Sequence, residues 1–176
     1  MNLTVFCGAS SGKDHIYGQT AAALGTWMAG RNITLVYGGG QTGIMGILAD
    51  AVLSGGGTVV GIIPDFLKTK EETHTGLTQL ITVHTMAERK RQLMEEGDAC
   101  LAMPGGPGTL EEIAEAVSSV RLGQFNKPCI FYNIHGYYDP LEEMFDRMVG
   151  TGFLNHRGRE KAIFVQSIAE IEHIIF

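Results

Sequence analysis

Arg89 and Lys90 occupy positions where a helical pattern calls for apolar side chains. The stretch TMAERKRQLMEEG (85–97) predicts a helix, and both residues share a face with Met86 and Leu93. Long cationic side chains at a sheet edge can extend their charged ends to solvent, so a structural role stays open. The functional interpretation is a cationic pair at the ligand-binding edge of a sheet, in which the Arg89 guanidinium binds a phosphate or carboxylate with two hydrogen bonds.

A carboxylate with a similarly unusual setting follows the glycine-rich stretch PGGPG (104–108). Thr109 and Glu112 fit a capping box, with Thr109 as the N-cap and Glu112 at N3, which predicts a structural role for Glu112. The helical row that Glu112 begins continues through apolar Ala116, whereas Glu111 begins a more polar row. A carboxylate on a half-buried row, in the first turn of a helix, is well placed for acid–base or electrostatic catalysis.

Short apolar runs alternate with amphipathic segments, and these elements must position the charged residues. The runs lie at 3–7, 33–37, 58–63, 80–83, 99–103, 128–132 and 162–165, and most of them are apolar on both faces, as covered parallel strands are. The alternation predicts a single α/β domain over 1–176. We expect a Rossmann-like three-layer fold, with a mostly parallel sheet of about seven strands and helices on both faces. Only 65–78 lacks a clear period, and we expect an irregular or functional loop there.

Three of the expected helices carry sequence signals for their ends or buried faces. Apolar spacing predicts a helix over 14–30. Asp139 and Pro140 predict an N-cap followed by a proline in the first turn, and Ser167 with Glu170 forms a capping box. The expected buried stripe of the helix that begins at Asp139 consists of Leu141, Met144, Phe145, Met148 and Val149.

Small-residue turns follow three of the predicted strands. They read CGASSG (7–12), YGGGQTGIMG (37–46) and MPGGPGT (103–109). Such turns meet at the carboxyl edge of a parallel sheet, where glycine lets backbone N–H groups approach a phosphate. One turn of this kind is often purely structural, but three together favour a phosphate-bearing ligand. GGGQTG (38–43) also matches a dinucleotide fingerprint, yet the acid expected about 20 residues later is absent from 57–63, which disfavours NAD(P).

Composition narrows the class of protein. A net charge of −6 argues against nucleic-acid binding, which needs clustered Lys and Arg. The three cysteines (Cys7, Cys100 and Cys129) indicate neither a disulfide framework nor a zinc site, and the first two are expected to be buried. No apolar stretch approaches the roughly 18 residues of a membrane span. We therefore expect a cytoplasmic enzyme or binding domain with no membrane partner.

The motifs resemble those of the LONELY GUY family, the cytokinin-activating phosphoribohydrolases that are also described as lysine decarboxylase-like. PGGPGTLEE fits the pattern PGGxGTxxE and MAERK fits MxxRK, with Arg89 and Glu112 23 residues apart, as in that pattern. YGGGQTGIMG and CGASSG match in order and spacing as well. The likeness covers residues from about 2 to about 150, and the chain length is similar to that of the smaller, dimeric branch.

The resemblance implies hydrolysis of the N-ribosyl bond of an adenine or cytokinin nucleoside 5′-monophosphate. The products would be the free base and ribose 5-phosphate, formed by a homodimer without a metal or other cofactor. Arg89 and Glu112 match the catalytic positions. The residues that match substrate contacts are Glu71, Met86, Lys90, Gly105, Gly106, Gly108, Thr109, Ser118, Gly8, Ser10, Gly39, Gly40, Gly43 and Met45.

Several alternatives stay open. A module that holds a nucleotide without turning it over would need only the glycine turns. The residues argue against a pyridoxal-dependent decarboxylase, which would need a Schiff-base lysine: of the six lysines only Lys90 has a pocket-like setting, and it lies beside an arginine without a recognisable set of partners. Met86, Met94 and the helix over 108–122 carry more apolar surface than one sheet face needs, which favours a dimer. The sequence does not separate adenine from N6-prenylated adenine, because distant side chains assemble the base pocket.

Overall fold

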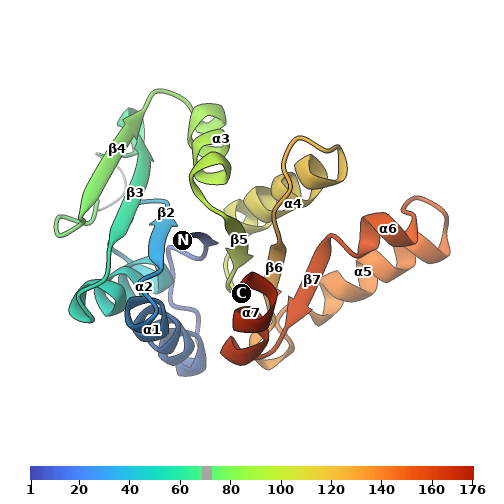
Figure 1. Ribbon diagram of the computed structural model, residues 1–176, viewed down its shortest axis with the longest axis horizontal. Helices are drawn as coiled ribbons and strands as arrows, with labels where there is room; N and C mark the ends of the chain where they lie inside the picture. Colours follow the sequence, from blue (N-terminus) through green and yellow to red (C-terminus); the bar gives the residue numbers. More distant parts are fainter. Residues whose placement is uncertain (69–72) are drawn as a thin grey trace.

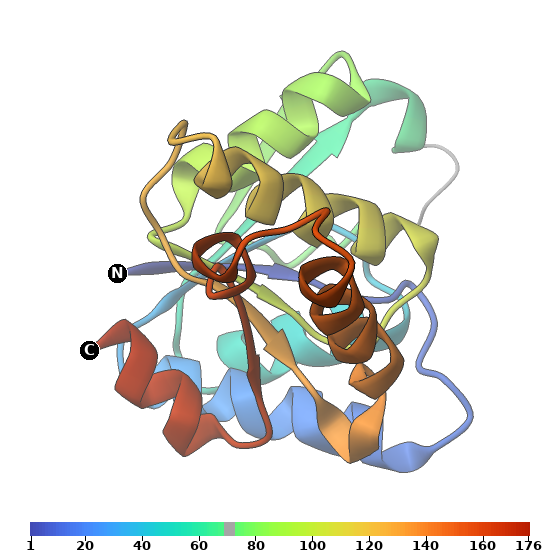
Figure 2. The same cartoon turned by 90° about the vertical axis from the view of Figure 1, so that its right-hand side faces the viewer.

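The computed structural model describes residues 1–68 and 73–176, which form one sheet between two layers of helices (Figures 1 and 2). The strands are β1 (Asn2–Phe6), β2 (Thr34–Tyr37), β3 (Val59–Pro64), β4 (Gln79–Val83), β5 (Ala99–Ala102), β6 (Cys129–Tyr132) and β7 (Ala162–Val165). The helices are α1 (His15–Gly30), α2 (Gly43–Ser54), α3 (Met86–Glu96), α4 (Pro107–Arg121), α5 (Asp139–Gly150), α6 (His156–Arg159) and α7 (Ile168–Ile175). Two short 3-10 helices, η1 (Asp65–Leu67) and η2 (Ile134–Gly136), complete the described elements.

The sheet has seven strands in the order β4-β3-β2-β1-β5-β6-β7, and every neighbouring pair is parallel. This confirms the predicted fold class. The chain builds outward from β1 to β4, then returns to place β5 on the other side of β1. The connections therefore change direction between β1 and β5, and in open α/β sheets ligands bind outside the carboxyl ends of strands at such a point. The extent of a single domain over 1–176 stays a prediction.

Alternating side chains of the strands divide the core into two clusters. Leu3 and Leu35 belong to the cluster beneath α1, α2 and α7, whereas Phe6 and Val36 belong to the cluster beneath α3, α4 and α5. Figure 2 shows α1 and α7 below the sheet and α3 and α4 above it. Burial on both faces explains why the strands read as apolar runs. Within the described ranges, no helix is long and apolar enough to cross a membrane.

The helix α5 departs from the predicted pattern. None of its residues is buried, and Met144 in the expected buried stripe is 46% exposed. Figure 1 shows α5 beside α6, beyond the edge strand β7, so the sheet covers only part of this helix. The predicted N-cap is also wrong by one residue: Tyr138 is the N-cap, and Asp139 instead accepts a hydrogen bond from the side chain of Asn133.

Other predicted signals are confirmed. The capping box of Ser167 with Glu170 is present at the start of α7, and a second box, Thr85 with Glu88, begins α3. Cys7 and Cys100 are buried free thiols, as is Cys129. The described parts of the stretch 65–78, which are 65–68 and 73–78, contain η1 and a backbone bridge between Gly40 and Thr73. Met94, one of the residues that favoured a dimer, is buried in the core of this chain.

Candidate active site

The turns after β1 and β5 meet where the connections change direction. The backbone N–H of Gly8 donates to the carbonyl of Pro104 over 3.3 Å. A Cβ on Gly105 would lie 2.1 Å from Thr109 Oγ1 and 2.9 Å from the backbone nitrogen of Gly8. Only glycine at position 105 therefore allows the two turns to pack this closely. Two cavities open beside this junction, and both include Gly8 and Gly106 in their walls.

The first cavity, called here the Arg89–Glu112 cavity, has a volume of about 390 Å³. It brings together Arg89 of α3 and Glu112 of α4, two helices that β5 and the glycine turn after it connect along the chain. The other predicted residues in its wall are Gly8, Met45, Met86, Gly106, Gly108 and Thr109. All three predicted glycine turns and both predicted catalytic residues thus line a common cavity.

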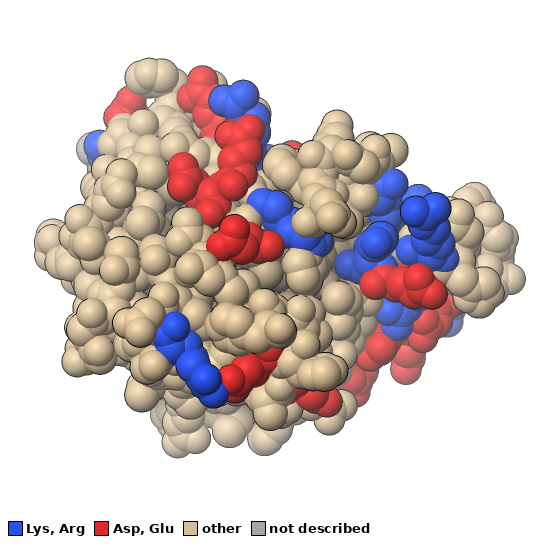
Figure 3. All heavy atoms as spheres, in the orientation of Figure 1, with Lys and Arg blue, Asp and Glu red and all other residues tan. Residues whose placement is uncertain are grey.

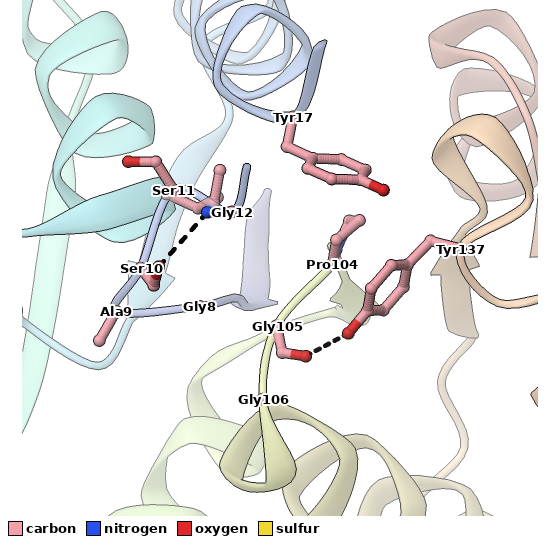
Figure 4. Close-up of a pocket in the computed structure, with 11 residues that line it drawn as sticks. Gly8, Ala9, Ser10, Ser11, Gly12, Tyr17, Pro104, Gly105, Gly106 and Tyr137 are labelled. Atoms are coloured by element: carbon pink, nitrogen blue, oxygen red, sulfur yellow. Dashed lines mark hydrogen bonds between the residues drawn. The ribbon is translucent and has the colours of Figure 1, made fainter. Parts of the chain in front are cut away.

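The second cavity, called here the tyrosine cavity, has a volume of about 330 Å³ (Figure 4). Its walls are the turn over residues 8–12, which includes predicted Ser10, and the stretch 104–106. Tyr17 and Tyr137 cover it with their rings in an edge-to-face arrangement, 5.9 Å between centroids. The hydroxyl of Tyr137 donates to the carbonyl of Gly105, as the dashed line in Figure 4 shows, so this ring is tied to the glycine turn.

Main-chain carbonyls hold the guanidinium of Arg89 in place. Nε donates to the carbonyl of Ile62 over 3.1 Å and Nη2 donates to the carbonyl of Gly38 over 3.0 Å, while the side chain is only 7% exposed. A Cβ on Gly38 would lie 2.2 Å from Nη2, so the glycine at this position makes room for the arginine. The result is a fixed positive charge at the wall of the cavity, provided by a side chain that stays protonated.

The start of α4 differs from the prediction. The helix begins at Pro107 with Gly106 as its N-cap, so Thr109 is the third helical residue and the predicted capping box of Thr109 with Glu112 is wrong. Proline in the first turn is favoured because it needs no N–H acceptor there. Gly106 has no side chain with which to cap the helix, so the first-turn N–H groups are available to bind an anion. Glu112, half-buried, lies one turn further into the cavity wall.

The charge of Glu112 is felt by the thiol of Cys7 in the same cavity. Burial, together with the nearby negative charge of Glu112, raises the pKa of Cys7 well above its ordinary value. This thiol therefore stays protonated at neutral pH and is a poor nucleophile. Burial also raises the pKa of Cys100 to about 11 and of Cys129 to about 12. Of the three cysteines, only Cys7 lines the Arg89–Glu112 cavity, and it contributes an uncharged side chain there.

Lys90 has two carboxylate partners. Its ammonium lies 2.7 Å from Glu111 and 2.7 Å from Glu115, and these hydrogen bonds raise its pKa. The contacts tie α3 to α4, and Lys90 does not line either of the two cavities. Glu111, by contrast, lies at the edge of the Arg89–Glu112 cavity. The predicted contact between Lys90 and substrate stays a prediction.

The remaining predicted contacts lie around the cavities or outside the described residues. Gly39 and Gly43 have φ of 80° and 63°, a left-handed conformation that favours glycine, and Gly40 packs against the side chain of Met45. These three glycines shape the turn between β2 and α2 behind the cavity wall. Ser118 is exposed further along α4. Glu71 lies outside the described residues.

Sequence reasoning missed a fourth turn at the same sheet edge. Tyr137 follows η2, in which His135 and Gly136 have φ of 52° and 72°. The sequence NIHGYYDP, directly after a strand, contains the signal, because glycine before an aromatic pair at a strand end marks a turn at the ligand-binding edge. Tyr17 and Leu67 also line the cavities without a local signal. Among the described His, Cys, Asp and Glu residues, no group of three or more could hold a metal ion.

Comparisons with known proteins identify relatives over almost the whole chain. A family model described as possible lysine decarboxylase matches residues 45–175. The cytokinin riboside 5′-monophosphate phosphoribohydrolase of Rhodococcoides fascians is 44% identical over 168 residues, covering 95% of this chain and 85% of the relative. An Arabidopsis thaliana protein of the same name is 39% identical over 169 residues, covering 96% of this chain and 79% of the relative.

Solved structures share the fold at lower identity. The molybdenum cofactor carrier protein of Chlamydomonas reinhardtii has a TM-score of 0.75 at 18% identity, covering 99% of this chain and 97% of that chain. The molybdenum cofactor binding protein of Rippkaea orientalis has a TM-score of 0.71 at 20% identity, with the same coverage of 99% and 97%. At these identities the likeness supports the fold alone.

Proposed function

This chain belongs to the LONELY GUY family of phosphoribohydrolases, and we propose that it hydrolyses the N-ribosyl bond of adenine-type nucleoside 5′-monophosphates. The products are the free base, of the cytokinin type in the named relatives, and ribose 5-phosphate. One structural observation carries the proposal at the level of residues. Arg89 and Glu112 line one cavity beside the glycine-rich start of α4.

The start of α4 suits the 5′-phosphate of the substrate. Helix N-termini attract anions through their unpaired N–H groups and the helix dipole, and here Gly106 and Gly108 leave those groups uncovered by side chains. The buried hydroxyl side chain of Thr109 lies in the same first turn. A phosphate bound there would place the attached ribose within the Arg89–Glu112 cavity.

Glu112 suits the chemistry at the ribose. Departure of the base builds positive charge on the ribose ring, and a carboxylate beside that ring stabilises it, as in glycosidases. The same carboxylate orients or deprotonates the attacking water. The fixed guanidinium of Arg89 then positions the substrate and balances negative charge in the cavity. The apolar side chains of Met45, Leu67 and Met86 line the same space and offer contacts for a base.

The test is a comparison of two glutamates of α4. We expect Glu112→Gln to lose several orders of magnitude in kcat for base release from AMP and from isopentenyladenosine 5′-monophosphate, with an unchanged Tm. Glu115→Gln is the matched control, because it makes the same change on the same helix, in a side chain that is 39% exposed, paired with Lys90 and outside both cavities. Base release by Glu112→Gln at the wild-type rate contradicts the role of Glu112.

The same experiment separates the proposal from its alternatives. A binding module without activity predicts that AMP raises the Tm of wild type and Glu112→Gln alike and that neither releases a base. A decarboxylase that forms a Schiff base would need a lysine at the site. No lysine lines either cavity in the part of the chain described, and Lys90 is engaged by two carboxylates.

We also propose that the protein is a cytoplasmic homodimer. The family resemblance supports the dimer, and so does exposed apolar surface on α3, α4 and α5: Met86 is 36%, Leu110 45% and Met144 46% exposed. Burial of such side chains between two copies would stabilise the association. Light scattering coupled to gel filtration should give twice the chain mass of 19.0 kDa, and a monomer at micromolar concentration contradicts the proposal.

A further inference from the structure

A third cavity lies at the opposite edge of the sheet from the candidate active site. It is enclosed by the end of α4, the loop that leads into β6, the helix α6 and the residue before β7. Its volume is about 560 Å³. These segments precede β6 and β7, so they lie at the amino edge of the parallel sheet, whereas the glycine turns follow their strands at the carboxyl edge.

The side chains that line this cavity are positively charged or neutral. They include Arg121 from α4, Arg157 from α6 and Lys161 before β7, together with Asn126 and Asn155, and none of the lining residues is acidic. We call this site the cationic cavity. Figure 3 shows Lys and Arg side chains on the right of the molecule, near the ends of α4 and α6 in Figure 1, with Asp and Glu side chains beside and below them.

These three cations are unusual because they are unpaired in an acidic protein. Most of the described Lys and Arg side chains contact a carboxylate or a carbonyl, as Arg31, Lys90 and Arg159 do. Across residues 1–68 and 73–176, the Lys and Arg side chains without any such contact are Lys13, Arg121, Arg147, Arg157 and Lys161. Three of these five line the cationic cavity, although the chain has a net charge of −6.

Local packing brings two of the cationic segments together. A Cβ on Gly158 would lie 3.0 Å from Arg121 Nε and 2.7 Å from Leu154 Cδ1, so glycine in α6 makes room for the arginine of α4. The side chain of Asn155 accepts a hydrogen bond from the backbone N–H of Gly158 and holds this turn of α6 in place. The Nε end of the Arg121 guanidinium therefore lies against α6, although the residue as a whole is exposed.

We propose that the cationic cavity binds the oligophosphate group of a small metabolite, such as a nucleoside di- or triphosphate. Three converging cations with no neighbouring lining acid match a ligand of three or more negative charges better than a single phosphate monoester. The two arginines offer planar forks that match phosphate oxygens. Leu122, 76% exposed, and Phe125 at the same wall supply apolar surface for the organic part of the ligand.

The test maps binding by nuclear magnetic resonance of 15N-labelled protein at 150 mM NaCl. ATP and tripolyphosphate are added separately, and amide signals of Gly123, Phe125 and Gly158 report on the cationic cavity. Amides of Gly8 and Gly105 report on the candidate active site. We expect saturable shifts at the first group with both probes, and tighter binding of ATP if the nucleoside contributes. Shifts confined to the second group, or shifts that rise linearly without saturation, overturn the proposal.

Matched variants distinguish a site from a general effect of charge. Arg157→Gln should weaken binding about two- to fivefold, as expected for one exposed ion pair, and the triple variant Arg121→Gln, Arg157→Gln, Lys161→Gln roughly tenfold or more. Arg147→Gln is the control, because Arg147 is also exposed and unpaired but does not line the cavity. Equal weakening by Arg147→Gln and Arg157→Gln overturns the proposal. Because no turnover is measured, the result is independent of the proposed hydrolase activity.

Discussion

Alanine substitutions at Gly105, Gly106 and Gly108 test why the turn between β5 and α4 contains three glycines. A Cβ on Gly105 would collide with Thr109 and with the backbone of Gly8, at 2.1 Å and 2.9 Å. A Cβ on Gly106 or on Gly108 would meet no heavy atom within 4 Å. None of the three glycines has the positive φ that disfavours alanine. Packing therefore explains the first glycine and leaves the other two unexplained.

The structure predicts a different loss of stability for each variant. Gly105→Ala should cost about 1–3 kcal/mol in the free energy of unfolding, as overpacking does. Gly106→Ala should stay within about 1 kcal/mol of wild type, because the poorer N-cap is offset by a less flexible unfolded chain. Gly108→Ala, in the first turn of α4, should be neutral or more stable by up to about 1 kcal/mol.

Activity should follow a different order. If first-turn N–H groups of α4 hold the 5′-phosphate, a methyl group at position 106 or 108 enters the space of the ligand. Loss of one hydrogen bond to a charged group costs about 1.5–3 kcal/mol, or roughly 10- to 150-fold in kcat/KM. The assay measures urea unfolding and base release from AMP side by side. Full stability with kcat/KM within twofold of wild type for both variants would refute the phosphate-binding role of this turn.

Three further substitutions test other parts of the site and the fold. Gly38→Ala should displace the guanidinium of Arg89 and lower kcat/KM at least about tenfold with an unchanged circular dichroism spectrum; wild-type activity would contradict the role of Arg89. Lys90→Met removes partly exposed ion pairs, so we expect a loss of about 1 kcal/mol or less in urea unfolding that shrinks in 1 M salt, and a salt-independent loss would contradict this reading. Backbone hydrogen bonds lower the pKa of Glu170, so its contribution is complete above the unfolded-state pKa and is lost as pH falls through the folded-state pKa. Glu170→Gln should therefore flatten the fall in Tm between about pH 5 and pH 3, and an unchanged slope would exclude this contribution.

The fold was predictable because its signals are local. Most strands are covered on both faces and so read as apolar runs, the edge strand β4 being largely exposed, and each glycine turn follows its strand directly in the sequence. The capping box of Ser167 with Glu170 was predictable for the same reason. Its counterpart at Thr109 was not, because Gly106 and Pro107 offer a competing helix start two to three residues earlier. The spacing of residue types alone does not decide between two possible N-cap positions, Gly106 and Thr109.

Contacts between distant segments left no signal. The carbonyls that hold Arg89 belong to Ile62 and Gly38, 27 and 51 residues away, and a main-chain carbonyl is present in every residue type, so it leaves no mark in the sequence. The sequence pattern could place this arginine on the apolar face of α3, but it could not identify the groups that accept its hydrogen bonds. The same holds for Lys90, whose partners lie on α4. For Phe145 and its neighbours on α5, the apolar spacing predicted which side of the helix packs on the core. It did not predict that α5 lies beyond the edge strand β7, where the sheet covers only part of that side.

Burial of a cation is therefore weak evidence for a catalytic role, since main-chain carbonyls satisfy Arg89 without any substrate. The stronger evidence lies in residues that the protein itself does not explain. Gly38 is explained by Arg89, and Gly105 by its neighbours. Gly106 and Gly108 are needed neither for backbone conformation nor for packing among the described residues, yet both line the cavity at an uncapped helix start. We propose that glycine at these two positions leaves room for a bound group outside the chain, and an anion is the group that a helix N-terminus favours.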